Sequence, residues 1–96
     1  MSTEQISTSE HQTYRAACEA RLRTVFQGDT LVWITDEQYH ANGPVWQVGL
    51  VYQSDMGRWM RRRYRYDIPS DTLHFAGEQP ITDAELLAAR RGGRRL

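Results

Sequence analysis

Two neighbouring segments of the chain alternate in character at every second residue, and this pattern restricts the fold more than any other feature. The first segment is Val45 to Gln53, and the second is Arg58 to Asp67. Successive side chains of a β-strand point to opposite faces of a sheet. Both segments therefore predict strands, and the fold depends on which face of the first strand continues into which face of the second.

The connection between the two strands favours one register. A two-residue loop that pairs Gln53 with Arg58 would place three arginines among apolar groups, and an unpaired buried charge is strongly unfavourable. A three-residue loop over residues 55–57 pairs Ser54 with Arg58 and puts Gly57 at the left-handed position that such a turn requires. Turn chemistry and charge burial therefore predict the same pairing.

This pairing gives the two strands an apolar face and a polar face. The apolar face is predicted to hold Trp46, Val48, Leu50 and Tyr52 against Tyr66, Tyr64, Arg62 and Met60. The polar face is predicted to hold Gln47, Gly49, Val51 and Gln53 against Arg65, Arg63, Arg61 and Trp59. Arg62 is the one charged residue on the apolar face, so we expect it near the sheet edge or paired with a helix carboxylate.

Helices are predicted towards both ends of the chain. Apolar residues between positions 14 and 26 recur at the three- and four-residue spacing of one helix face, and Gly28 is the expected C-cap. A second, short helix is predicted from 82 to 91, because Thr82 and Glu85 have the spacing of a capping box. The apolar face of the sheet is the one large surface that these helices could cover, so we expect both on it.

Shorter strands complete the predicted fold. Thr30 to Thr35 is β-branched and aromatic, while Thr72 to Ala76 is a shorter candidate that ends where Gly77 to Pro80 breaks the chain. Asp36 to Pro44 predicts a loop. The predicted class is α+β, with an N-terminal helix, a three- or four-stranded antiparallel meander and a short C-terminal helix.

The length of 96 residues suits one domain with one core. We expect that domain at residues 9–91, with a flexible tail at 1–8 and a flexible basic end at 92–96. The single cysteine cannot form an internal disulfide, and no apolar run approaches the roughly 20 residues of a membrane span. The sequence therefore predicts a cytoplasmic protein without a membrane segment, and it contains no cofactor motif such as a glycine-rich phosphate loop.

The net charge is zero, but residues 58–66 carry five arginines. Three of them, Arg61, Arg63 and Arg65, would lie about 6.6 Å apart along one strand face. With Trp59 as a stacking platform they suggest a surface for an acidic protein partner or for nucleic acid. Alternating charges also protect an exposed sheet from aggregation, which is the competing structural explanation. The candidate binding face comprises Arg61, Arg63, Arg65, Trp59, Gln47, Gly49 and Gln53.

Asp36 to His40 suggests a different class of function, because two carboxylates lie near an imidazole there. This grouping suggests a small enzyme or metal-binding protein. However, His11 and His74 lie on other elements, so no second cluster of ligands supports it. Cys18 falls on the apolar side of the first helix, which indicates a core residue rather than a nucleophile. The sequence therefore favours a small non-enzymatic binding module.

Overall fold

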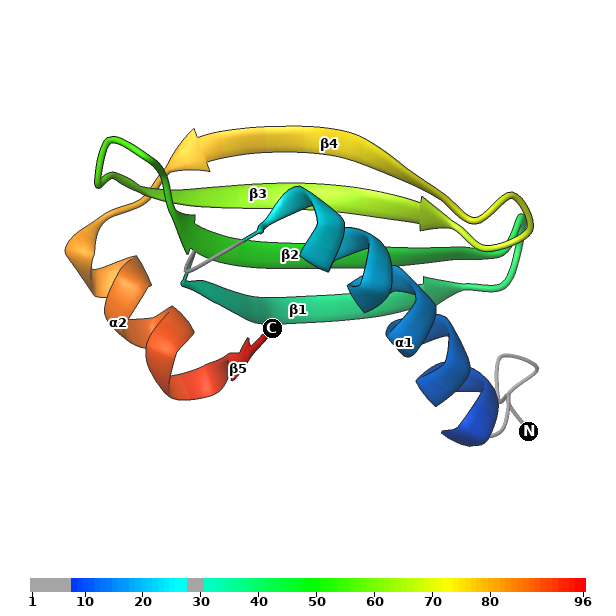
Figure 1. The fold of residues 1–96 in the computed structure, drawn as a ribbon. Helices are drawn as coiled ribbons and strands as arrows, with labels where there is room; N and C mark the ends of the chain where they lie inside the picture. Colours follow the sequence, from blue (N-terminus) through cyan, green and yellow to red (C-terminus); the bar gives the residue numbers. More distant parts are fainter. Residues whose placement is uncertain (1–7, 28–30) are drawn as a thin grey trace.

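The computed structural model describes residues 8–27 and 31–96 (Figure 1). The tail predicted at 1–8 lies outside the described residues up to position 7, and so does the helix cap predicted at Gly28. Within the described part, the elements in chain order are α1 (Thr8–Val25), β1 (Val32–His40), β2 (Val45–Gln53), β3 (Trp59–Asp67), β4 (Thr72–Pro80), α2 (Asp83–Gly92) and β5 (Arg94–Arg95).

The strands form one antiparallel sheet in the order β4-β3-β2-β1-β5. The predicted α+β class and meander are confirmed, but the sheet has five strands rather than three or four. The additional strand is β5, in the segment expected to be a flexible basic end. Gly93 brings this segment so close to the Ile34 carbonyl that a Cβ atom would collide with it. The Leu96 amide then donates to the Val32 carbonyl at 3.1 Å.

The pairing of β2 with β3 follows the predicted register. Gly49 lies opposite Arg63, and Gln53 lies opposite Trp59. The Ser54 amide donates to the Arg58 carbonyl at 2.8 Å, and the glycine of the three-residue loop has a φ of 80°. Because this register separates apolar from charged side chains, it also determines where the core forms.

β1 and β4 extend further than predicted. β1 continues to His40 through the expected loop, and β4 continues to Pro80 through the expected break. Each strand contains a bulge, near Thr35 and near Ala76 respectively. β4 is the edge strand and is mostly exposed, and in the added part of β1 the inward position is taken by Glu37, which is paired with Arg15 and Arg94. Neither sequence therefore has a regular apolar alternation.

α1 covers the apolar face of the sheet, crossing in front of the strands in Figure 1. Cys18 and Leu22 of the helix are fully buried against strand residues that include Trp46 and Tyr64. The predicted burial of these four residues is therefore confirmed. The core cluster comprises Cys18, Leu22, Val32, Ile34, Trp46, Val48, Leu50, Tyr52, Tyr64 and Tyr66.

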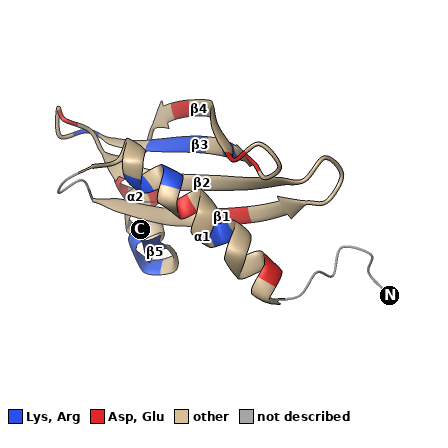
Figure 2. Cartoon of the chain, turned by 45° about the vertical axis from the view of Figure 1, so that its right-hand side comes forward, with Lys and Arg blue, Asp and Glu red and all other residues tan. Residues whose placement is uncertain are grey.

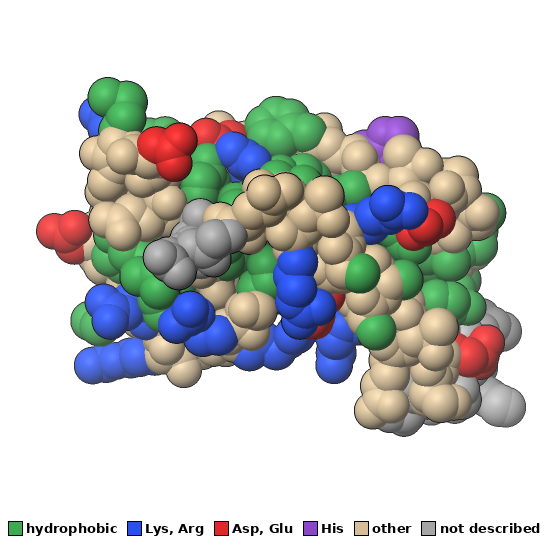
Figure 3. All heavy atoms as spheres, viewed as in Figure 1, with side chains coloured by type: hydrophobic (Ala, Val, Ile, Leu, Met, Phe, Trp, Pro, Cys, Tyr) green, Lys and Arg blue, Asp and Glu red, His purple; other side chains and the backbone are tan. Residues whose placement is uncertain are grey.

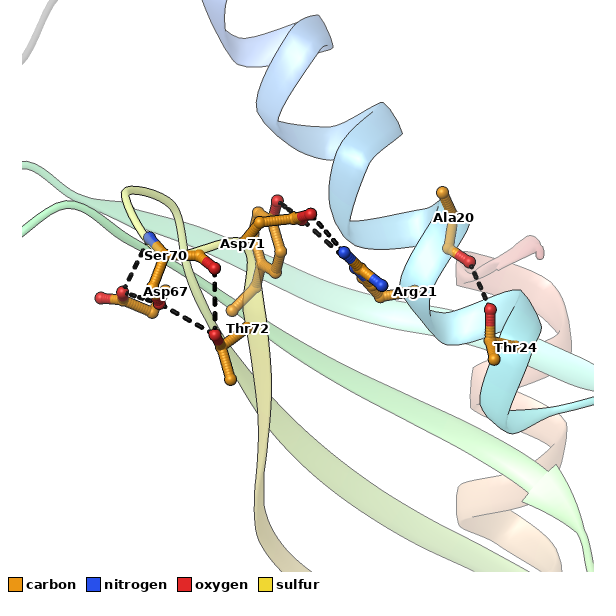
Figure 4. Close-up of polar contacts among 8 residues, drawn as sticks. Ala20, Arg21, Thr24, Asp67, Ser70, Asp71 and Thr72 are labelled. Atoms are coloured by element: carbon orange, nitrogen blue, oxygen red, sulfur yellow. Dashed lines mark hydrogen bonds and ion pairs between the residues drawn. The ribbon is translucent and has the colours of Figure 1, made fainter.

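Arg21 ties α1 to the turn between β3 and β4 (Figure 4). It forms an ion pair with Asp71, which has a left-handed backbone conformation with a φ of 54°. The same carboxylate accepts a hydrogen bond from the hydroxyl of Tyr66. The pKa of Asp71 is lowered to about 2, first by the hydrogen bond from Arg21 and then by the one from Tyr66. One turn carboxylate thus joins the helix to the core strand.

α2 lies against the polar face, so the prediction that both helices share the apolar face is wrong. Glu85 of α2 forms an ion pair with Arg61, and Arg90 lies over the ring of Trp33, 5.5 Å from its centroid. Val51, on the same face, is completely buried. The ring centroids of Trp59 and Trp33 lie 5.7 Å apart on this face. With Val51 they form a second apolar surface, against which the short helix packs.

Candidate binding site on the open sheet face

The part of the polar face that α2 leaves uncovered is organised in two rows across four strands. We call this part the open face. Its first row contains, from β1 to β4, Asp36, Gly49, Arg63 and Gly77. Its second row contains, in the same order, Gln38, Gln47, Arg65 and His74. Glycines on either side of Arg63 leave the first row low, so a trough runs across the strands between α2 and the polar second row.

Two hollows lie along this trough, and Arg63 and Ala76 border both. The hollow on the β1 side has a volume of about 300 Å³, and its lining includes Asp36, Gln38, Gln47 and Arg65. The hollow on the β4 side has a volume of about 290 Å³, and its lining includes Arg61, Gly77 and Gln79. Polar side chains therefore border both hollows, and the guanidinium of Arg63 lies between them.

Gly49 makes room for a carboxylate in the floor of the trough. A Cβ atom at Gly49 would overlap the side chain of Asp36, which occupies the space that the glycine leaves. A carboxylate oxygen of Asp36 lies 3.6 Å from a guanidinium nitrogen of Arg63, and both side chains are 56% exposed. Exposed ion pairs at this separation contribute little to stability. Asp36 therefore orients the Arg63 guanidinium, but the ion pair is weak enough for Arg63 to bind another carboxylate.

The side chain of Arg65 is exposed and forms neither a hydrogen bond nor an ion pair with the side chains of the described residues. The nearby carboxylate of Asp67 is engaged by the Ser70 hydroxyl, which is the main cause of its lowered pKa. Next to Arg65 in the row, the Gln47 amide oxygen lies 3.0 Å from a ring nitrogen of His40. The second row thus presents one unpaired guanidinium beside an oriented amide.

Three residues of the predicted binding face are engaged elsewhere. Arg61 donates to Glu85 at 3.2 Å, and its side chain is only 24% exposed. Trp59 packs against Trp33, and the Gln53 amide donates to the carbonyl of its own hairpin loop at 3.2 Å. The structure therefore brings Arg63, Arg65, Gln47 and Gly49 together at the trough. Arg61 borders the hollow on the β4 side but is held by Glu85, whereas Trp59 and Gln53 line neither hollow.

Asp36 and Gln38 belong to the trough but were not predicted. The part of β1 after Thr35 was expected to be a loop, and the side chains of a loop cannot be assigned to a face of the sheet. The alternation of Asp36, Gln38 and His40 with Glu37 and Tyr39 was the one feature that could have placed them. On the β4 side, the bulge at Ala76 shifts the register by one residue, so the pairing of Gly77 with Arg63 could not be predicted from the sequence.

The alternative site at Asp36 to His40 is divided between the two faces of the sheet. Glu37 points towards α1, where it lies 3.2 Å from Arg15 and 2.9 Å from Arg94. Asp36 and His40 lie on the opposite face. Within residues 8–27 and 31–96, no three His, Cys, Asp or Glu side chains are grouped as a metal site would require.

Arg62, the charge on the apolar face, was expected near the sheet edge or paired with a helix carboxylate; it lies on β3, next to the edge strand β4, and its carboxylate partner belongs to that strand and not to a helix. It forms an ion pair with Glu78 of β4 and donates to the hydroxyls of Tyr52 and Tyr64. Burial alone would lower the pKa of Arg62, but hydrogen bonds to Tyr64 and Glu78 raise it above its ordinary value. This arginine is part of the core architecture.

Comparison of the chain with protein-family models, curated proteins and solved structures finds no match. Neither helix described in residues 8–27 and 31–96 has the length and apolar character needed to cross a membrane. Function is therefore inferred from the chemistry of the trough.

Proposed function

We propose that the protein is a non-enzymatic binding module whose trough holds an acidic segment of a protein partner. The observation that carries this proposal is the pair Arg63 and Arg65, exposed side by side along a trough with a glycine-lined floor. A guanidinium binds a carboxylate through two parallel hydrogen bonds. The amides of Gln38 and Gln47 add donors and acceptors that suit the backbone of an extended peptide.

The distribution of charge favours an acidic protein over nucleic acid. Binding to nucleic acid strengthens with each phosphate that a basic side chain neutralises. Arg61 is already paired with Glu85, Arg63 faces Asp36, and Trp59 is packed where it cannot stack on a base. A partner with spaced carboxylates fits two available guanidiniums better than a continuous row of phosphates does.

The proposal is tested by NMR titration with three probes: a glutamate-rich octapeptide, its glutamine counterpart and a single-stranded oligonucleotide. We expect the glutamate peptide to shift the side-chain signals of Arg63, Arg65 and Gln47 at about 50 mM salt, where screening is weak. The glutamine peptide should leave these signals unchanged. The R63Q/R65Q variant should lose the response.

The matched control is R58Q/R91Q, which removes the same net charge from exposed arginines outside the trough. Equal loss of binding in both double variants would show general electrostatic attraction and contradict the proposal. Tighter binding of the oligonucleotide than of the glutamate peptide would also overturn it in favour of nucleic acid.

A further inference from the structure

The outer edge of β4 is not paired with any strand in the described structure. β4 is the first strand of the sheet, and no element runs along its outer side in Figure 1. An edge strand presents free backbone donors and acceptors to a further strand. The opposite edge differs, because β5 pairs with part of β1 there.

The pairing of β3 shows which residues of β4 have outward backbone groups. The Arg58 carbonyl accepts from β2, whereas the Trp59 carbonyl accepts from the Ile81 amide on the β4 side. Backbone bonds alternate along antiparallel strands, so the odd-numbered residues of β3 bond to β4. Their partners in β4 are Gln79, Gly77, His74 and Thr72. The amides and carbonyls of Leu73 and Phe75 therefore face outwards.

The side chains of this edge suit another strand as well. Leu73 and Phe75 lie on the apolar face, and Phe75 is 60% exposed. Hydrophobic side chains project at the upper margin of the molecule in Figure 3, where β4 lies. The single charged residue of β4 is Glu78 (Figure 2), which is already paired with Arg62.

Sheet edges are normally protected by charges, bulges or proline. In β4 these features begin only at the bulge near Ala76 and end with Pro80. Residues 72–75 have none of them. Residues 72–75 also include Leu73 and Phe75, whose backbone amides and carbonyls face outwards. An added antiparallel strand requires such groups at alternate positions.

We propose that residues 72–76 pair with the same segment of a second copy of this chain, antiparallel, about a two-fold axis at His74. Leu73 then lies opposite Phe75 of the second copy, and Phe75 opposite its Leu73. Both positions have outward amides and carbonyls, so the axis at His74 satisfies all of them. The two-fold gives each copy the same contacts and closes the assembly at a dimer.

This dimer would place both copies of the trough on the same side of a continuous sheet, because the axis is perpendicular to the strands and to the sheet. α1 of each copy would lie on the opposite side. The pairing itself depends on backbone groups and two apolar side chains and does not require the proposed acidic partner.

Sedimentation equilibrium over about 1 to 500 µM tests the pairing, with 11.2 kDa expected for one chain. We expect the mass to rise towards that of two chains. F75E and L73K should each raise the dissociation constant at least about tenfold, because each places two charges opposite apolar partners. Mixing the two variants should restore association, since one contact becomes glutamate with lysine and the other stays leucine with phenylalanine.

L87E is the matched control, because Leu87 is an exposed apolar residue of α2, far from this edge in sequence. It should associate as the unchanged protein does. Amide exchange gives a second readout in which Leu73 and Phe75 become protected at high protein concentration, while His74 is protected throughout. A single-chain mass at every concentration, or association that F75E leaves unchanged, would overturn the proposal.

Discussion

Replacing Arg62 with methionine tests what stabilises a guanidinium on the apolar face. Its two terminal nitrogens donate to the hydroxyls of Tyr64 at 2.7 Å and Tyr52 at 2.6 Å, and it forms an ion pair with Glu78. The guanidinium carbon lies 4.6 Å from the centroid of the Tyr52 ring. The side chain is 21% exposed, so these contacts are only partly shared with water.

The expected cost follows from what methionine keeps and what it loses. Its unbranched chain preserves much of the packing against the rings, but all three polar contacts disappear. A hydrogen bond to a charged group contributes roughly 1.5–3 kcal/mol net of the bonds to water. The three contacts share one partly exposed guanidinium and are not additive, so their joint loss should be close to the value of one such bond. Glu78 keeps its 2.8 Å hydrogen bond from Tyr52, so its carboxylate is not left without a partner. We therefore expect the free energy of unfolding to fall by about 2 kcal/mol.

Urea denaturation followed by tryptophan fluorescence measures this change in the free energy of unfolding. In thermal denaturation, the melting temperature should fall by roughly 10 °C for a domain of this size. The control is R65M, because the Arg65 side chain is exposed and has no ion-pair partner in residues 8–27 and 31–96; exposed substitutions usually change stability by less than about 0.5 kcal/mol. If R62M is no less stable than R65M, the network around Arg62 contributes no net stability and the reasoning fails.

Four further predictions concern the core and its charged support. Trp46 is 4% exposed, so W46A should lower the free energy of unfolding by about 3–5 kcal/mol in urea titrations. Burial, and then the carboxylates near it, raise the pKa of Cys18 to about 12, so Ellman's reagent should modify it slowly at pH 8 unless urea is added. The lowered pKa of Asp71 implies stability that is lost as the pH falls from about 4 to about 2, and D71N should remove this dependence. Burial, and then the bond to Asp71, raise the pKa of Tyr66 to about 12, so stability should decrease between about pH 10 and pH 12, and Y66F should flatten that decrease in urea titrations.

The central hairpin could be predicted because two independent requirements agreed. Gly57 suits a three-residue turn, and the same turn keeps Arg61, Arg63 and Arg65 away from the core. The capping box at Thr82 was likewise local, and both of its hydrogen bonds are present in the structure. Features that depend on a few adjacent residues were therefore accessible from the sequence.

The misassigned strands and helix depend on contacts between distant residues. The polar part of β1 after Thr35 is a strand because β2 supplies a partner, and nothing within that segment encodes the partner. The placement of α2 depends on Trp33, Val51 and Trp59 coming together on a face that otherwise reads as polar. The trough is affected by both difficulties, because Asp36 enters it from β1 and α2 holds Arg61 at its border through Glu85.

The arginines of β3 show why identical residues in one strand have different roles. Arg61 and Arg62 lie where α2 and the aromatic core supply fixed partners, and both are mostly covered. Arg63 and Arg65 lie further along β3, beyond the part that α2 covers. Arg63 therefore has only a loose contact with Asp36, and Arg65 has no ion-pair partner among the described residues. Substituting all three arginines of the polar face together would therefore combine a loss of the contact to α2 with a loss of binding. Changing Arg63 and Arg65 while keeping Arg61 separates the two effects, because the ion pair that joins α2 to the sheet stays intact.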